Sequence, residues 1–148
     1  MTPIGLIPKF AGDPQRGMNH DWEEMNMKNL CAMFEISVED FNRAKEFYES
    51  ILKMEITEMN VLDTQIGMFP MEGYLNWGCI SKCAQHRPSK DGALIYLNAD
   101  NDIDGMLEKV KSAGGEIVTP KTKLNDQFGF IAVFLNTEGN RIALHALK

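Results

Sequence analysis

The amino-acid sequence predicts an α+β fold in which two βαβββ modules share one chain of 148 residues. The main observation is that the order strand, helix, strand, strand, strand occurs twice, with an offset of roughly 61 to 62 residues. A second observation is that an aspartate suited to capping a first helical turn precedes each predicted helix, Asp40 in the first module and Asp102 in the second. Fusion of two related units is the simplest cause of such a repeat.

The first module is predicted to begin with a strand in "CAMFEISV", residues 31–38, where the side chains alternate between two faces. The helix "FNRAKEFYESIL" carries its large apolar residues at helical spacing, which predicts one buried face. Turn-rich segments then separate three short expected strands, near residues 54–60, 64–70 and 77–83.

The second module repeats this pattern, beginning with a strand in "ALIYLNA", residues 93–99. The helix "IDGMLEKVKSAGG" is predicted to stop at its two final glycines. Further strands are expected at residues 116–119, 128–136 and 141–147. Because each sheet has one helix layer, its other face must be covered or must line a cavity.

The predicted organisation is an N-terminal arm, residues 1–28, followed by a single domain, residues 29–148. The two modules of this domain are expected to span about 29–90 and 91–148.

Two hypotheses are open for residues 1–26. The tripeptide Trp-Glu-Glu can be encoded by a purine-rich run that resembles a ribosome-binding site, just before Met25 and Met27. Natural translation would then begin at Met27, and an intact mass of the native protein would test this start. The other hypothesis is an arm that packs on the domain or across a dimer.

The amino-acid composition and the net charge exclude some classes of binding partner. Hydrophobic residues make up 44% and charged residues 24% of the chain, and the net charge is −6. Nucleic acids and anionic membranes require clustered Lys and Arg, so neither is expected as a partner. No stretch approaches the roughly 18 apolar residues of a membrane span, and residues 1–17 lack the apolar core of a signal peptide. The chain has three cysteines, an odd number, and we expect a reduced cytoplasmic location. The expected partner is a small-molecule ligand.

The cysteines of "CISKC", Cys79 and Cys83, do not fit a disulfide or a usual zinc motif. In a strand they would lie roughly 13 Å apart, at about 3.3 Å per residue. Their three-residue gap is also unlike zinc-knuckle spacing, although the nearby His86 keeps a zinc alternative open. Buried or half-buried thiols are the favoured interpretation. His86 and Arg87 are expected in an exposed, solvated hairpin loop.

Strand alternation assigns a set of side chains to the face away from the helices. This set is mostly apolar with a few polar groups, which is typical of a small-molecule pocket. Trp77, in the turn-rich stretch near the expected cavity mouth, could stack on a planar ligand, although packing is the favoured interpretation. Strand alternation and this turn-rich stretch together give the predicted ligand-binding residues, which are Met33, Ser37, Leu94, Asn98, Arg141, Ala143 and Trp77.

Glu35 shares this face, and an ionised carboxylate between apolar strand neighbours is costly unless it is paired. One interpretation is a pair with Arg141 or His145 that fixes strand register. A second makes Glu35 a general base, with His145 or Tyr96 as proton donor, acting on a carbon acid or an epimerisable centre. A third has Arg141 anchor a carboxylate or phosphate without chemistry.

Three stretches carry a resemblance to a known family: "FEISVEDFNRAKEFYESILKMEI", "GALIYLNADNDIDGMLEKVKSAGGEIVTPKT" and "FGFIAVFLNTEGNRIALHAL". The chain resembles the vicinal oxygen chelate superfamily, also called the glyoxalase/bleomycin-resistance/dioxygenase superfamily. Its second half is most similar to predicted enzymes related to lactoylglutathione lyase. The resemblance implies a curved, U-shaped mixed sheet around a ligand cavity, and frequent homodimers.

The resemblance also locates the metal positions of the family. Metal-dependent members place donors at strand positions that correspond here to Met33, Leu94 and Ala143. None of these offers an oxygen or imidazole donor, and a thioether is a poor ligand for Zn²⁺, Fe²⁺, Ni²⁺ or Mn²⁺. We therefore expect no metal, no cofactor and no glyoxalase I activity. Two function classes stay open: a metal-independent lyase or isomerase with Glu35 as base, and a protein that binds or sequesters a small molecule.

Overall fold

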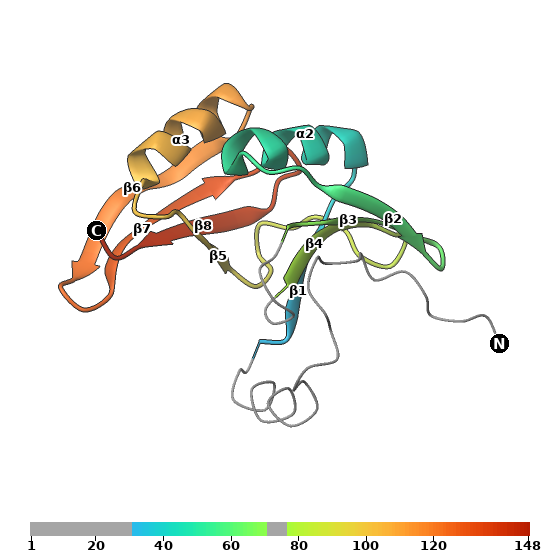
Figure 1. The fold of residues 1–148 in the computed structure, drawn as a ribbon, viewed down its shortest axis with the longest axis horizontal. Coiled ribbons are helices and arrows are strands. Elements are labelled where there is room, and N and C mark those ends of the chain that lie inside the picture. The colour runs from blue at the N-terminus through green and yellow to red at the C-terminus, as the bar shows by residue number, and fades with distance from the viewer. Residues whose placement is uncertain (1–30, 71–76) are drawn as a thin grey trace, which may run out of the picture. The chain divides into compact units, whose positions relative to one another are not determined.

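The strands form two four-stranded mixed sheets, one for each predicted module (Figure 1). A computed structural model describes residues 31–70 and 77–148. The predicted N-terminal arm, residues 1–28, and both hypotheses for its origin lie outside these described residues. The domain and module boundaries stay predictions.

The first sheet has the strand order β1-β4-β3-β2. Strand β1 pairs in parallel with β4, which is possible because helix α2 (Phe41–Leu52) and two strands intervene in sequence. The other pairs are antiparallel. The strands are β1 (Met33–Ser37), β2 (Thr57–Val61), β3 (Thr64–Met68) and β4 (Trp77–Lys82).

The second sheet repeats this topology in the order β5-β8-β7-β6, with β5 parallel to β8. Helix α3 (Ile103–Ser112) follows its first strand, as α2 does in the first module. The α+β class with two βαβββ modules is therefore confirmed. The strands are β5 (Ile95–Asn98), β6 (Glu116–Asn125), β7 (Gly129–Leu135) and β8 (Arg141–Ala146).

Strand β6 is longer than predicted, since the expected strand ended at Thr119. Pro120 lies inside it and cannot donate a ladder hydrogen bond. An edge strand tolerates such a residue, and β6 is the outer strand of its sheet. Its pairing with β7 shows three register shifts, which absorb the irregularity.

Both predicted helix caps are confirmed. The Asp40 carboxylate accepts a hydrogen bond from the Arg43 N–H at 3.0 Å, and the Asp102 carboxylate accepts one from the Gly105 N–H at 2.9 Å. Each bond satisfies one of the N–H groups that a helix start leaves without a backbone partner. Neither α2 nor α3 is long and apolar enough to cross a membrane.

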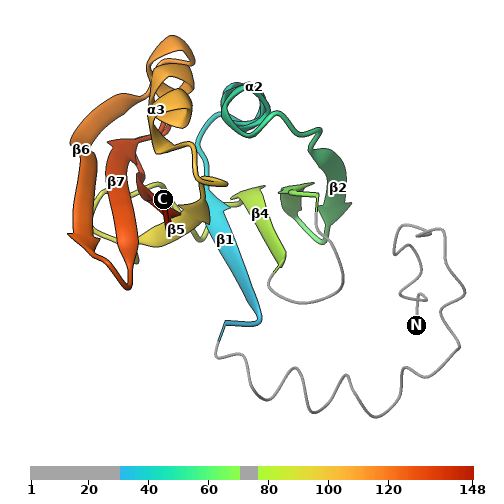
Figure 2. The same cartoon turned by 60° about the vertical axis from the view of Figure 1, so that its left-hand side comes forward.

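The core lies between the two helices and one face of the sheets. Helices α2 and α3 lie side by side over this face (Figures 1 and 2), and they contact each other. A side chain at Gly67 of β3 would meet Ile56 at 2.7 Å and Ile80 at 2.8 Å, so glycine permits close packing at this position. The largest fully buried core side chains include Phe47, Tyr48, Ile51, Ile80, Ile103, Phe134, Ile142 and Leu144.

The turn between β7 and β8, residues 136–140, connects the modules through a buried glutamate. The Glu138 carboxylate accepts hydrogen bonds from the N–H groups of Glu39 and Asp40, at 3.1 and 2.7 Å. It also accepts one from Arg43 Nε at 2.7 Å. The Glu138 side chain has no exposed surface, whereas that of Arg43 is about half exposed. One carboxylate of the second module therefore satisfies donors before and inside the first turn of α2.

The electrostatics of Glu138 follow from these contacts. Burial raises the pKa of the Glu138 carboxyl, but the hydrogen bonds from Arg43, Asp40 and Thr137 outweigh burial and hold this pKa below its ordinary value of 4.5. The charged form is therefore stabilised more in the folded than in the unfolded chain. This contribution to stability is complete above the unfolded pKa and is lost as the pH falls through the folded pKa.

We expect Glu138→Gln to lower the free energy of unfolding by about 2 kcal/mol at neutral pH, because charge-assisted hydrogen bonds are lost. The difference from the wild type should begin to shrink as the pH falls below the ordinary pKa of 4.5, and it should vanish once the pH has fallen through the lower pKa of the folded carboxyl. Urea unfolding between about pH 3 and pH 7 measures both effects. The control is Glu108→Gln, at an exposed ion pair with Lys111. Equal stability of Glu138→Gln and wild type at neutral pH would contradict the assignment.

Candidate functional site

A cleft of about 270 Å³ joins the two modules. It lies where β1 meets β5, the start of β8 and the loop between the modules. This volume is slightly below the range of about 300 to 1,000 Å³ that is usual for ligand pockets, which suits a small metabolite. The lining residues are Glu35, Ile36, Ser37, His86, Arg87, Ser89, Gly92, Ala93, Ile95, Asn140, Arg141 and Ile142.

Strand alternation explains how polar groups reach this cleft. In β1, Ile36 is buried in the core, so its neighbours Glu35 and Ser37 face away from α2. In β8, Ile142 is buried and Arg141 is exposed. Glu35, Ser37 and Arg141 were predicted from the same alternation, and all three line the cleft.

The partner predicted for Glu35 is wrong. Its Oε1 accepts a hydrogen bond from Ser81 Oγ at 2.5 Å, rather than pairing with Arg141 or His145. The reason is strand order: β1 hydrogen-bonds to β4, so the nearest side chains on its open face come from β4. The Glu35 side chain is exposed, and its carboxylate is held by a hydroxyl donor instead of a cation.

Two guanidinium groups give the cleft an excess of positive charge over its single carboxylate, that of Glu35. Arg141 is exposed and belongs to none of the ion pairs among the described residues. Arg87 is 80% exposed, and its Nη1 lies 3.9 Å from Glu39 Oε2, so this ion pair is weak. Guanidinium groups match carboxylate and phosphate oxygens with paired donors. The arrangement therefore favours an anion.

His86 and Arg87 are exposed, as expected, yet they also line the cleft, which the sequence did not indicate. They belong to the irregular segment between β4 and β5. Strand or helix periodicity assigns no face to such a segment, so the sequence carried no signal for their position.

Asn140 is a second residue that the sequence analysis missed as part of the site. Its side chain donates through Nδ2 to the Ser37 carbonyl at 2.7 Å and accepts through Oδ1 from the Ser89 N–H at 2.9 Å. It therefore connects the end of β1, the inter-module loop and the start of β8. Its position in the "EGNR" segment predicted only a turn.

The other residues predicted for catalysis lie outside the cleft lining. His145 Nε2 lies 2.7 Å from the Phe128 carbonyl oxygen. His145 comes four positions after Arg141 along β8, a distance of roughly 13 Å at about 3.3 Å per residue. Tyr96 is 51% exposed on β5, paired in register with Ala143. The structure therefore does not bring Glu35, His145 and Tyr96 together in one cleft.

The remaining predicted ligand-binding residues are also absent from the cleft lining. Met33 and Leu94 are exposed, and Ala143 is fully buried. Asn98 Oδ1 accepts a hydrogen bond from the Asp100 N–H at 2.9 Å, which stabilises the turn after β5. Trp77 begins β4, is half-buried and pairs in register with Met33. These side chains lie on the strands or next to them, and they do not line a common pocket.

The residues at the family's metal positions do not fit a metal. Met33, Leu94 and Ala143 offer one thioether and two hydrocarbon side chains. Across residues 31–70 and 77–148, no group of three or more His, Cys, Asp or Glu side chains is placed to hold an ion.

The thiols do not form a reactive centre either. Cys31, Cys79 and Cys83 are free, and Cys83 lies just beyond β4 rather than within it. Burial, followed by the nearby charge of Glu35, raises the pKa of the Cys79 thiol to about 11. This thiol therefore stays protonated and unreactive at neutral pH.

Comparison with known proteins identifies the family. Residues 31–144 match the family model of the Glyoxalase/Bleomycin resistance protein/Dioxygenase superfamily, and the chain belongs to this superfamily. No curated protein sequence matches the chain significantly.

Solved structures share the fold. Glyoxalase I from Zea mays is 21% identical, with a TM-score of 0.63 over 78% of this chain and 45% of the maize chain. This chain thus spans less than half of the maize enzyme. A hypothetical protein from S. aureus is 20% identical, with a TM-score of 0.57 over 77% of this chain and 94% of that chain. The fosfomycin resistance protein FosX from Listeria monocytogenes is 20% identical, with a TM-score of 0.56 over 77% and 88%.

The chemistry at the family's metal positions leads to a direct prediction. Protein purified without chelator should carry no stoichiometric divalent metal, and added Ni²⁺ or Zn²⁺ should produce no turnover of the methylglyoxal–glutathione adduct, because donor side chains are missing. Elemental analysis and an activity assay measure these outcomes. Stoichiometric metal that is lost on changing Glu35 or His145 would contradict the prediction.

Proposed function

We propose that this chain binds a small anionic metabolite in the cleft between β1, β5 and β8. The observation that carries the proposal is the pair of guanidinium groups, Arg141 and Arg87, in a small cleft with one carboxylate. That carboxylate, Glu35, has one oxygen engaged by Ser81. An acidic group of the ligand would bind between the arginines, since a guanidinium offers parallel donors to two oxygens.

The other walls of the cleft suit the rest of such a ligand. Ala93 and Ile95 supply apolar surface for a short carbon skeleton, and Ser89 and Ser37 supply hydroxyl groups. Asn140 keeps the loop and β1 at a fixed separation through its two hydrogen bonds. A site held in place before the ligand arrives loses less entropy on binding. With its free thiols, the protein is proposed to act in the cytoplasm.

A metal-independent lyase or isomerase is the second candidate. Its support is that Glu35 lies in the same cleft and could remove a proton from a bound carbon acid. The proton donors proposed for it, His145 and Tyr96, are not among the cleft-lining residues. His86 also lines the cleft, but none of the hydrogen bonds among the described residues orients its ring toward Glu35, and for this reason binding is the better-supported function.

Arg141→Met is expected to lower the affinity for an anionic ligand at least about tenfold, because a desolvated charge contact is lost. A thermal-shift screen of short carboxylates and inorganic phosphate identifies a ligand, since ligand at 100 times its Kd stabilises the fold by about 2.7 kcal/mol. The control is Lys90→Met, at an exposed loop residue outside the cleft lining. Unchanged affinity in Arg141→Met would contradict the proposed anchor.

The same ligand separates the two candidate functions. In deuterated buffer, a binding protein leaves the carbon-bound hydrogens of the ligand in place. Catalysed exchange that is abolished by Glu35→Gln, with ligand affinity retained, would favour the enzyme instead.

A homodimer is also proposed. Leu94 and Tyr96 are 37% and 51% exposed and lie two residues apart, so both side chains are on one face at the edge strand β5. Met33, on the open face of β1, is 38% exposed. Exposed apolar side chains grouped on a surface are typical of contact sites between proteins.

Light scattering coupled to size-exclusion chromatography should therefore give twice the chain mass for the wild type. Tyr96→Lys should shift the protein toward the monomer, because the interface would have to bury a charge. Val61→Lys, at an exposed residue on the edge strand β2, is the matched control. A monomeric wild type would exclude this role for the β5 face.

A further inference from the structure

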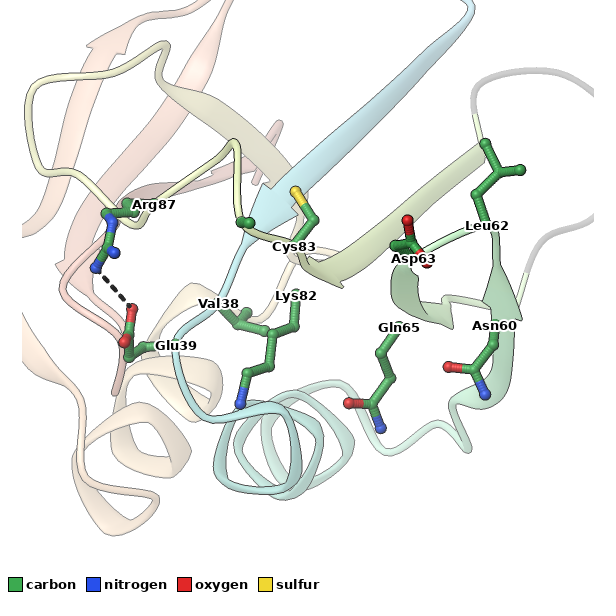
Figure 3. A pocket seen from close by; sticks show the side chains of 10 residues that line it. Val38, Glu39, Asn60, Leu62, Asp63, Gln65, Lys82, Cys83 and Arg87 are labelled. Carbon is green, nitrogen blue, oxygen red and sulfur yellow. Dashed lines mark ion pairs between the residues drawn. The ribbon is translucent and has the colours of Figure 1, made fainter.

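A second hollow, of about 550 Å³, lies at the ends of β2, β3 and β4. Its lining includes Val38 and Glu39 from the segment before α2, and Arg87 from the inter-module loop (Figure 3). We refer to this hollow as the groove. We propose that the groove is a binding site for a small hydroxylated monoacid, such as a sugar acid. This proposal is independent of the function proposed for the cleft.

The floor of the groove is a row of three polar side chains on neighbouring strands. Asn60 of β2 pairs in register with Gln65 of β3, and Gln65 pairs with Lys82 of β4. Residues directly opposite each other in antiparallel strands share a face and lie about 5 Å apart. The three side chains extend to the same side of the sheet in Figure 3, whereas Asp63 and Cys83 extend to the other. Two amides and an ammonium group thus form a row about 10 Å long.

This row has no partners within the described part of the chain. None of the side-chain hydrogen bonds or ion pairs found there involves the side chain of Asn60, Gln65 or Lys82. Glu58 lies on β2 two residues before Asn60, on the same face, but its carboxylate pairs with Lys45 of α2 at 3.3 Å. The ammonium group of Lys82 is therefore available to an external acid.

Charge balance selects a monoanion. At the rim, Arg87 lies 3.9 Å from Glu39 in a weak, exposed ion pair (dashed line in Figure 3) and also belongs to the anion site proposed for the cleft. Lys82 is the lining cation on the side to which the floor residues extend, and none of the ion pairs among the described residues includes it. A single carboxylate neutralises it, whereas a phosphate dianion would leave a negative charge facing Glu39.

The amide groups of Asn60 and Gln65 favour a ligand that carries hydroxyl groups beside its carboxylate. Asn and Gln side chains each donate and accept hydrogen bonds, and so do hydroxyl groups. Adjacent hydroxyls on a carbon chain can therefore pair with Asn60 and Gln65 while a terminal carboxylate meets Lys82. The groove offers little apolar surface beyond Val38, Leu62 and Ala84, which disfavours an aromatic or hydrocarbon ligand.

Titration with gluconate, followed by calorimetry or by NMR shifts of the protein, tests the proposal. We expect saturable binding to the wild type, with glucose and acetate each at least about tenfold weaker, because each supplies only half of the recognised groups. Lys82→Met and Gln65→Leu should each weaken gluconate binding about tenfold or more. Lys82 is exposed and Gln65 is partly exposed, so both variants should fold.

The matched controls are Lys90→Met and Gln127→Leu, at exposed residues outside the groove, and both should keep wild-type affinity. Arg141→Met, in the cleft, should also bind gluconate normally, which separates this site from the first. Absence of saturable gluconate binding, equal binding of acetate, or wild-type affinity in Lys82→Met would each overturn the proposal.

Discussion

One buried carboxylate connects the two modules through hydrogen bonds. Glu138 accepts hydrogen bonds from the N–H groups of Glu39 and Asp40 and from the guanidinium group of Arg43. A negative charge is favourable at the start of a helix, where N–H groups lack backbone partners. A buried carboxylate without its donors costs several kcal/mol, so the arrangement is stable only when all the donors are in place. These hydrogen bonds fix the turn after β7 at the start of α2.

The same turn also builds the candidate site. The side chain of Asn136 donates through Nδ2 to the hydroxyl of Tyr48, a fully buried residue of α2, at 2.8 Å. Its Oδ1 accepts a hydrogen bond from the Asn140 N–H at 2.9 Å. The Asn140 side chain in turn donates a hydrogen bond to the Ser37 carbonyl and accepts one from the Ser89 N–H. A single five-residue turn therefore joins the helix core of one module to the cleft between both. Stability and the proposed ligand binding are therefore expected to be coupled, because a change that loosens the turn would also move the walls of the cleft.

The sequence was sufficient to predict the helices and the faces of the strands, but not which strands lie next to each other in a sheet. Capping aspartates and helical spacing located α2 and α3, and strand alternation placed Glu35, Ser37 and Arg141 on the face that lines the cleft. Alternation does not tell which strand lies beside β1, so the partner of Glu35 was assigned to β8 instead of to Ser81 on β4. Irregular segments have no period at all, and Arg87 could therefore not be placed from sequence.

We expect the distribution of polar groups to distinguish this chain from the metal-dependent members of its family. The positions that correspond to the family's metal ligands carry Met33, Leu94 and Ala143, and Ala143 is fully buried. Charged groups are found instead at the seam between the modules, where Arg87 and Arg141 approach the end of β1. A fold can keep its backbone while its chemistry changes, since function depends on the side chains of a site rather than on the architecture. The guanidinium groups of Arg87 and Arg141 are the strongest electrostatic element of the cleft, and the proposed recognition of an anion follows from them directly.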